Sequence, residues 1–299
     1  MVPASSQTLD YQIVDVFTET ALKGNGLAVV FDTVGLSSER MQAIAREFNL
    51  SETTFIQRRD VETEKREGVR VRIFTTQEEL PFAGHPTLGT ASVLKLAAPE
   101  TISGDTIKLA LNVGTVPVRF KADSLFGEMM QRDPEFGDQL DPAEVARLIG
   151  LTLGELSASA APQVVSTGTA FAIVALRSHE ALARLRIDQE DATKYLREHG
   201  GRWFYVLGPT DGDTPAWRAR MQFYGGEDPA TGSAAGCAIS YLVRYGFVAP
   251  GRQIHVRQGV EIGRASDLFL AADGVSGKVG DVRVGGSTVR VAKGELFLP

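Results

Sequence analysis

The sequence predicts an α+β protein made of two related halves, in each of which a β-sheet wraps around one central helix. Three observations support this prediction. Short alternating or β-branched runs, typical of strands, recur along the 299 residues. Two helical segments are small or apolar on almost every side, as expected of buried helices. Segments of both kinds in the first half reappear in the second half at a nearly constant spacing.

The predicted strands alternate with amphipathic helices. The clearest strand runs begin at residues 11, 27, 69, 171 and 202 and read YQIVDVF, LAVVF, VRVRIF, FAIVAL and RWFYVL. The first helix is expected over residues 36–48, where the Ser37 side chain can cap the first turn. Because Met41, Ile44 and Phe48 then share one face, this helix should cover the sheet from outside.

Two further outer helices have recognisable ends. Residues 141–150 begin with Asp141 as a cap and Pro142 at the first helical position, and they end at Gly150. Residues 189–199 form the third such helix, which is followed by a glycine pair.

The two buried helices follow Pro86 and Pro229, where the chain reads TLGTASVLKLAA and ATGSAAGCAISYLVRYG. Small residues such as Gly89 and Gly232 let neighbouring backbone approach closely. Each segment should therefore be the axis of one half.

An internal repeat relates these segments. HPTLGTA at residue 85 matches DPATGSA at residue 228 with an offset of 143, and GNGLAVVF at 24 matches GTAFAIVA at 168 with an offset of 144. Two matches at nearly one spacing indicate a duplicated unit.

From this repeat we expect a first half of residues 1–120 plus 289–299 and a second half of residues 121–288. We expect the active site in the cleft between the halves.

The composition excludes several classes of function. With 31 basic and 37 acidic residues, the net charge of −6 lacks the basic patch that nucleic acids or anionic membranes require. Cys237 is the only cysteine, so an internal disulfide framework and a thiolate zinc cluster are excluded. The four scattered histidines show no HExxH motif, so no metal site is expected. Residues 1–10 do not resemble a secretion signal, and no membrane span is evident, which predicts a cytoplasmic protein.

The starts of the buried helices are candidate binding positions. Each is expected to begin with a polar residue, His85 or Asp228, followed by proline at the first helical position. A helix N-terminus presents unpaired N–H groups and a positive dipole end, which favours a small anionic substrate. Asp is also a common helix cap, so Asp228 by itself has a purely structural interpretation, whereas His is a poor cap.

Longer motifs resemble a known family. NLSETTF at residue 49, ELPFAGHPTLGT at 79 and EDPATGSAAG at 227 resemble the signature stretches of the PhzF-like isomerases of phenazine biosynthesis, and QGVEIGR at 258 resembles their C-terminal region. The resemblance implies the diaminopimelate-epimerase-like fold, with two similar halves that each enclose a helix. It also implies a homodimer without a cofactor.

The same resemblance assigns the site. It implies that Glu52 transfers the proton as general acid and base. His85 and Asp228 are the other catalytic residues expected. The residues expected to bind the substrate are Asn25, Gly84, Gly232 and Ser233. Phe82 and Tyr224 flank the motifs and are candidates to contact a ring.

The family activity implied is that of trans-2,3-dihydro-3-hydroxyanthranilate isomerase, in which a proton moves between carbons of a small cyclic amino and hydroxy acid. Two alternatives stay open from the sequence. One is an epimerase or racemase that uses His85 and Asp228 as two bases, and the other is a binding protein that has lost catalysis.

Overall fold

The computed structural model describes residues 7–98, 104–212, 214, 216–223, 226–275 and 278–298. The chain divides into two compact units, namely unit 1 (Met1–Met129 with Gly286–Pro299) and unit 2 (Met130–Gly285). The first division falls later than the expected 120/121, because strand β8 (Gly127–Met130) pairs with β7 (Gly114–Phe120).

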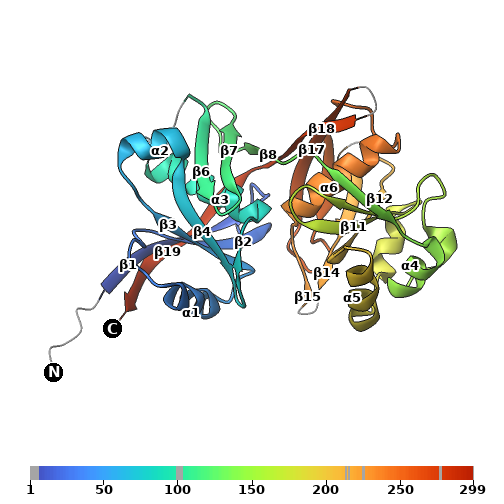
Figure 1. Cartoon of the computed structure of the whole chain (residues 1–299), viewed down its shortest axis with the longest axis horizontal. Coiled ribbons are helices and arrows are strands. Elements are labelled where there is room, and N and C mark those ends of the chain that lie inside the picture. The colour runs from blue at the N-terminus through green and yellow to red at the C-terminus, as the bar shows by residue number, and fades with distance from the viewer. Residues whose placement is uncertain are drawn as a thin grey trace. The chain divides into compact units, whose positions relative to one another are not determined.

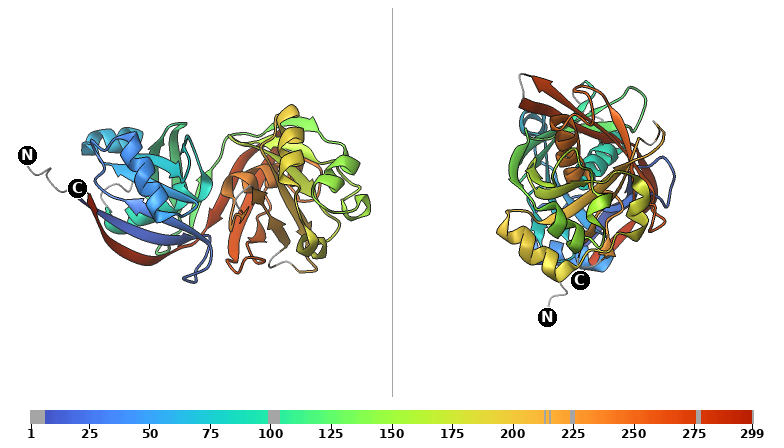
Figure 2. Two further views of the ribbon diagram at one scale, coloured as in Figure 1. Left: turned by 90° about the horizontal axis from the view of Figure 1, so that it is seen from below. Right: turned by 90° about the vertical axis from the view of Figure 1, so that its right-hand side faces the viewer.

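Unit 1 contains a sheet whose outer strand comes from the far end of the sequence. In spatial order its strands are β19 (Thr288–Leu298), β1 (Gln7–Val16), β2 (Asn25–Val30), β3 (Glu52–Gln57), β4 (Val69–Thr75), β6 (Thr106–Leu111), β7 and β8. The short β5 (Glu79–Leu80) also pairs with β4. Figure 2 shows β19, in red, running beside the blue β1, and the two are antiparallel along most of their length.

Unit 2 repeats this arrangement. Its spatial order is β9 (Glu135–Gln139), β10 (Gln163–Ser166), β11 (Ala170–Ala175), β12 (Trp203–Pro209), β13 (Trp217–Arg220), β16 (Ile254–Gln258), β17 (Ser266–Val275) and β18 (Lys278–Gly286). A separate two-stranded ribbon consists of β14 (Gln222–Phe223) and β15 (Gly226–Glu227).

Strand directions confirm the duplication. In unit 1, β1/β2 is antiparallel, β2/β3 parallel, β3/β4 antiparallel and β4/β6 parallel. In unit 2, β10/β11, β11/β12, β12/β13 and β13/β16 follow the same sequence of directions. The strands predicted from the runs at residues 11, 27, 69, 171 and 202 are β1, β2, β4, β11 and β12.

Each unit has a buried helix, as predicted. Helix α3 (Gly84–Ala97) contacts β1, β2, β3, β6, β7 and β19, and it is buried from its first residue to Leu94 (Figure 1). Helix α6 (Gly232–Arg244) packs against β10, β11 and β17. A Cβ atom on Gly89 would lie 2.7 Å from side-chain carbons of Val16 and Leu27, so glycine at this position lets α3 approach the sheet.

The outer faces of the sheets carry the amphipathic helices that the sequence predicts. They are α1 (Ser38–Phe48), α4 (Pro142–Leu148) and α5 (Gln189–Glu198), and α2 (Val61–Glu67) lies beside β4 and β6. Two 3₁₀ helices, η2 (Leu153–Glu155) and η3 (His179–Arg184), belong to unit 2. The Ser37 and Asp141 side chains cap α1 and α4 as expected.

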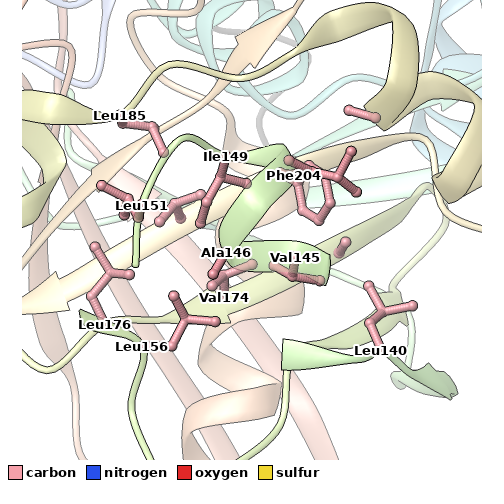
Figure 3. Close-up of a cluster of buried hydrophobic side chains, with 14 of the residues drawn as sticks. Leu140, Val145, Ala146, Ile149, Leu151, Leu156, Val174, Leu176, Leu185 and Phe204 are labelled. Carbon is pink, nitrogen blue, oxygen red and sulfur yellow. The ribbon is translucent and has the colours of Figure 1, made fainter. Parts of the chain in front are cut away.

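The outer core of unit 2 joins α4 to the sheet. In Figure 3, Val145, Ala146 and Ile149 at α4 lie among Val174 of β11 and Phe204 of β12. These side chains are at most 3% exposed. Burial of apolar surface on this scale stabilises the sheet that supports the site described below.

The expected starts of the two central helices are wrong. Helix α3 begins at Gly84, one residue before His85, so Pro86 lies inside the first turn. Proline is tolerated there because the N–H groups of the first turn have no partner within the helix. Helix α6 begins at Gly232, four residues after Asp228. Neither His85 nor Asp228 is therefore a helix cap.

Cys237, the single cysteine of the sequence, is buried in α6. Across the described ranges, the structure contains no helix that is both long enough and apolar enough to span a membrane.

Candidate active site

Glu52 and His85 of unit 1 come together from different elements. Glu52 is the first residue of β3, and His85 is the second residue of α3. His85 Nε2 lies 3.3 Å from Glu52 Oε2, and the side chains are 5% and 15% exposed. The contact is within ion-pair distance but is not aligned as a hydrogen bond. A largely buried carboxylate therefore faces an imidazole.

Asn25 lies on the other side of the His85 ring. The Asn25 Nδ2 atom is 3.2 Å from His85 Nδ1, and Asn25 is 1% exposed. When the amide donates to Nδ1, the proton of the neutral ring is on Nε2, which faces Glu52. Burial lowers the pKa of His85 to about 3, so the imidazole is neutral near pH 7.

A buried hydroxyl pair joins the two elements that carry Glu52 and His85. Thr54 Oγ1 of β3 lies 2.8 Å from Thr90 Oγ1 of α3, and both residues are fully buried. Thr54 is two residues along the strand from Glu52, so its side chain points to the same face of the sheet. This hydrogen bond fixes the position of β3 relative to α3.

In unit 2, Asp228 lies in the segment between β15 and α6. Its Oδ2 atom accepts a hydrogen bond of 2.7 Å from the Thr231 hydroxyl. Its backbone N–H donates to Met221 O, and its backbone carbonyl accepts from Gln258 Nε2. Asp228 is therefore held by both backbone and side chain, and these contacts keep it outside the helix.

The other predicted residues lie close to these groups in the sequence. Gly84 and Gly232 are the first residues of α3 and α6. The backbone N–H groups at the start of a helix have no hydrogen-bond acceptor within the helix. Ser233 follows Gly232 and is partly exposed. Phe82 precedes α3 and is also partly exposed, whereas Tyr224 lies outside the described residues.

The supporting residues could not be identified from the sequence. Thr54, Thr90, Thr231 and Gln258 make hydrogen bonds that hold Asp228 and the elements of Glu52 and His85 in place, but hydroxyl and amide residues alone carry no distinctive pattern. Gln258 is the exception that the sequence could have indicated, because it opens the QGVEIGR stretch. Among the described residues, no group of three or more His, Cys, Asp or Glu side chains could hold a metal ion.

Comparison with known proteins supports the motif assignment. Residues 14–294 match the family PhzC-PhzF, described as phenazine biosynthesis-like protein. An uncharacterized isomerase of Mesorhizobium japonicum is 36% identical, with 98% of this chain and 100% of the relative covered. Trans-2,3-dihydro-3-hydroxyanthranilate isomerase of Pseudomonas aeruginosa is also 36% identical, with 96% of this chain and 99% of the relative covered.

Solved structures agree. A PhzF-family phenazine biosynthesis protein of Bacillus anthracis superposes with a TM-score of 0.85 at 25% identity, covering 97% of this chain and 99% of that chain. A hydroxyproline epimerase of Agrobacterium vitis, 12% identical, matches with a TM-score of 0.62 over 97% of this chain and 93% of that chain, which shows the shared diaminopimelate-epimerase-like fold. The chain is therefore an isomerase that belongs to the PhzC-PhzF family.

Proposed function

We propose that this isomerase moves a proton between carbons of a small cyclic amino or hydroxy acid such as trans-2,3-dihydro-3-hydroxyanthranilate. Glu52 removes the proton from one carbon and returns it to another. The observation that carries the proposal is the contact between the Glu52 carboxylate and the neutral imidazole of His85. The relative of Pseudomonas aeruginosa, which is named for this substrate, supports the substrate class.

A single carboxylate suits this reaction. Glu52 must begin ionised, hold the proton briefly as a neutral acid and then release it. Neutral His85 supplies a hydrogen-bond donor at Nε2 without placing a positive charge beside the carboxylate. No acceptor among the described residues is aligned with this donor, so it can turn toward a substrate oxygen or nitrogen.

The remaining predicted residues would bind the substrate. We propose that Asp228 and Ser233 bind its polar groups and that the first N–H groups of α3 and α6, at Gly84 and Gly232, bind its carboxylate. Asn25 acts through His85, because its amide contacts the imidazole.

The two-base alternative is less well supported. In a two-base epimerase, His85 would have to accept a proton from carbon. Its Nδ1 faces the Asn25 amide, and its pKa is lowered to about 3 by burial, so it is a weak base. Glu52 is the better candidate for the base in unit 1.

Replacement of Glu52 by Gln tests the assignment. Gln keeps the shape of the side chain but cannot carry a proton between carbons, so Glu52→Gln should lower kcat by about 100-fold to 10,000-fold. The measurement is turnover of trans-2,3-dihydro-3-hydroxyanthranilate followed by absorbance and by NMR in deuterated water.

The controls separate the mechanisms. Transfer by one base should return part of the original hydrogen to the product, whereas two-base epimerisation should introduce solvent deuterium. Glu62→Gln is a matched control, because Glu62 lies on α2 and its side chain is 81% exposed. If Glu52→Gln kept wild-type turnover, the role assigned to Glu52 would be wrong.

A further inference from the structure

Gln258 is a buried amide at the end of β16, and both of its side-chain polar atoms are hydrogen-bonded. Its Oε1 atom accepts from the Tyr205 hydroxyl at 3.0 Å and from the Thr231 N–H at 3.2 Å. Its Nε2 atom donates to the Asp228 carbonyl at 2.8 Å and to Thr231 Oγ1 at 3.0 Å. Gln258 is fully buried, so water cannot replace these bonds.

Three of these four contacts are with the segment 228–231, which carries Asp228 and leads into α6. The Thr231 hydroxyl accepts from Gln258 and donates to Asp228 Oδ2. Because a hydroxyl has a single proton, its bond from Gln258 directs that proton toward the carboxylate. A continuous hydrogen-bonded chain therefore runs from Gln258 through Thr231 to Asp228.

The residue after Gln258 also contacts this segment. Gly259 has a φ of +74°, and a Cβ atom there would lie 2.6 Å from the carbonyl oxygen of Pro229. Gln258 and Gly259 thus bring the end of β16 against the backbone of residues 228–231. The backbone pairing of β16 does not require these two residue types, because other residues at positions 258 and 259 would form the same backbone hydrogen bonds.

We propose that Gln258 is a positioning residue for Asp228, which it acts on through Thr231 and through the Asp228 carbonyl. The proposal rests on the proposed function in one respect, namely that Asp228 takes part in the reaction. Without Gln258, the carboxylate would lose the orientation that Thr231 gives it, and the segment would lose its attachment to β16.

Gln163 provides a matched control. It is also a buried glutamine, 4% exposed, whose Oε1 accepts from a tyrosine hydroxyl (Tyr245) and whose Nε2 donates to a backbone carbonyl (Gly137). Both of these partners lie outside the Asp228 segment. Gln163→Met and Gln258→Met therefore remove similar hydrogen bonds from unit 2, but only the second releases Asp228.

Amide hydrogen exchange of the full-length protein tests the positioning itself. In Gln258→Met, peptides covering residues 226–233 should exchange about tenfold faster than in the wild type, because the bonds that hold this segment are lost. Gln163→Met should leave their exchange unchanged. Equal exchange in the two variants would overturn the proposal.

Kinetics of trans-2,3-dihydro-3-hydroxyanthranilate turnover test whether the positioning serves the reaction. Gln258→Met should lower kcat/KM by about 100-fold, and Thr231→Val should also lower it, whereas Thr231→Ser should restore most of the loss because it keeps the hydroxyl. Adding Gln258→Met to Asp228→Asn should cause little further loss, since both changes act through one carboxylate. Fully multiplicative losses would overturn the proposal.

The two measurements distinguish the hypotheses. If Asp228→Asn retained wild-type turnover, the role of Asp228 in the proposed function would fail, and the exchange experiment would still decide whether Gln258 holds the segment.

Discussion

At the scale of single residues, His85 shows how burial selects a protonation state. The side chain is 5% exposed, and Asn25 contacts one nitrogen of the ring while Glu52 lies near the other. Desolvation disfavours the charged imidazolium, so the folded protein binds the proton much less tightly than the unfolded chain does. Neutral His85 is part of the proposed mechanism, and the same property makes stability depend on pH.

The sign of this dependence follows from the two pKa values. The pKa of His85 is about 3 in the folded protein and near 6.5 in the unfolded chain, so below pH 6.5 the unfolded chain takes up a proton that the folded protein does not. The contribution of His85 to the free energy of unfolding is fully present above pH 6.5 and is lost as the pH is lowered toward 3. Between pH 7 and pH 5 the loss should be about 2 kcal/mol.

Urea unfolding of the wild type and of His85→Asn at both pH values measures this contribution. The variant should lose about 2 kcal/mol less than the wild type between pH 7 and pH 5, whatever its stability at pH 7. Equal losses would show that His85 is not kept neutral by the fold.

At the scale of secondary-structure elements, the sequence predicts the helices that depend on local signals, but not the features that depend on long-range contacts. The outer helices α1, α4 and α5 could be predicted because caps such as Ser37 and Asp141 act within a few residues. The start of α6 could not, because Asp228 is held outside the helix by Gln258, which is 30 residues away in the sequence. The resemblance to a family supplied Glu52, His85 and Asp228, but it contained no information on the hydrogen bonds that orient them.

The fit of α3 into its sheet depends on Gly89. Although Ala favours helices over Gly by about 1 kcal/mol, a methyl group at this position would lie 2.7 Å from carbons of Val16 and Leu27. Gly89→Ala should therefore destabilise the protein by a net of about 1–2 kcal/mol as the neighbours shift.

Chemical denaturation of Gly89→Ala and Gly154→Ala checks this prediction. A Cβ atom on Gly154, in η2, would have no neighbouring atom within 4 Å, so this substitution should change stability by less than about 0.5 kcal/mol. A Gly89→Ala variant as stable as the wild type would contradict the close packing of α3.

At the scale of the whole molecule, duplication accounts for the regularity of the fold. Both units repeat one order of strand directions around a buried helix, but they carry different residues at corresponding positions. Glu52 begins β3, whereas Trp203 begins β12 at the corresponding place in unit 2. The carboxylate that we propose as the base therefore has no counterpart at that position of unit 2, which is consistent with the single-base mechanism that we propose.

The pairing of the last strand, β19, with the first strand, β1, predicts that unit 1 and not unit 2 depends on β19. A protein truncated after Gly286 lacks the partner that pairs with β1 from Gln7 to Val16. The β1 amides of residues 7–10, which pair with β19 but not with β2, should exchange at nearly the rate of an unfolded peptide, while those of β11 and β12 should remain protected. Hydrogen exchange with mass spectrometry resolves these segments. Loss of protection in β11 and β12, or its persistence in residues 7–10, would contradict this division.

The placement of β19 in unit 1 has a consequence for biosynthesis. Unit 2 is one continuous stretch, residues 130–285, so all its strands have emerged from the ribosome before β19 does. Unit 1 emerges first but stays one strand short until translation reaches Thr288–Leu298. Domains usually complete folding in the order in which they are made, whereas here we expect unit 2 to be completed before unit 1.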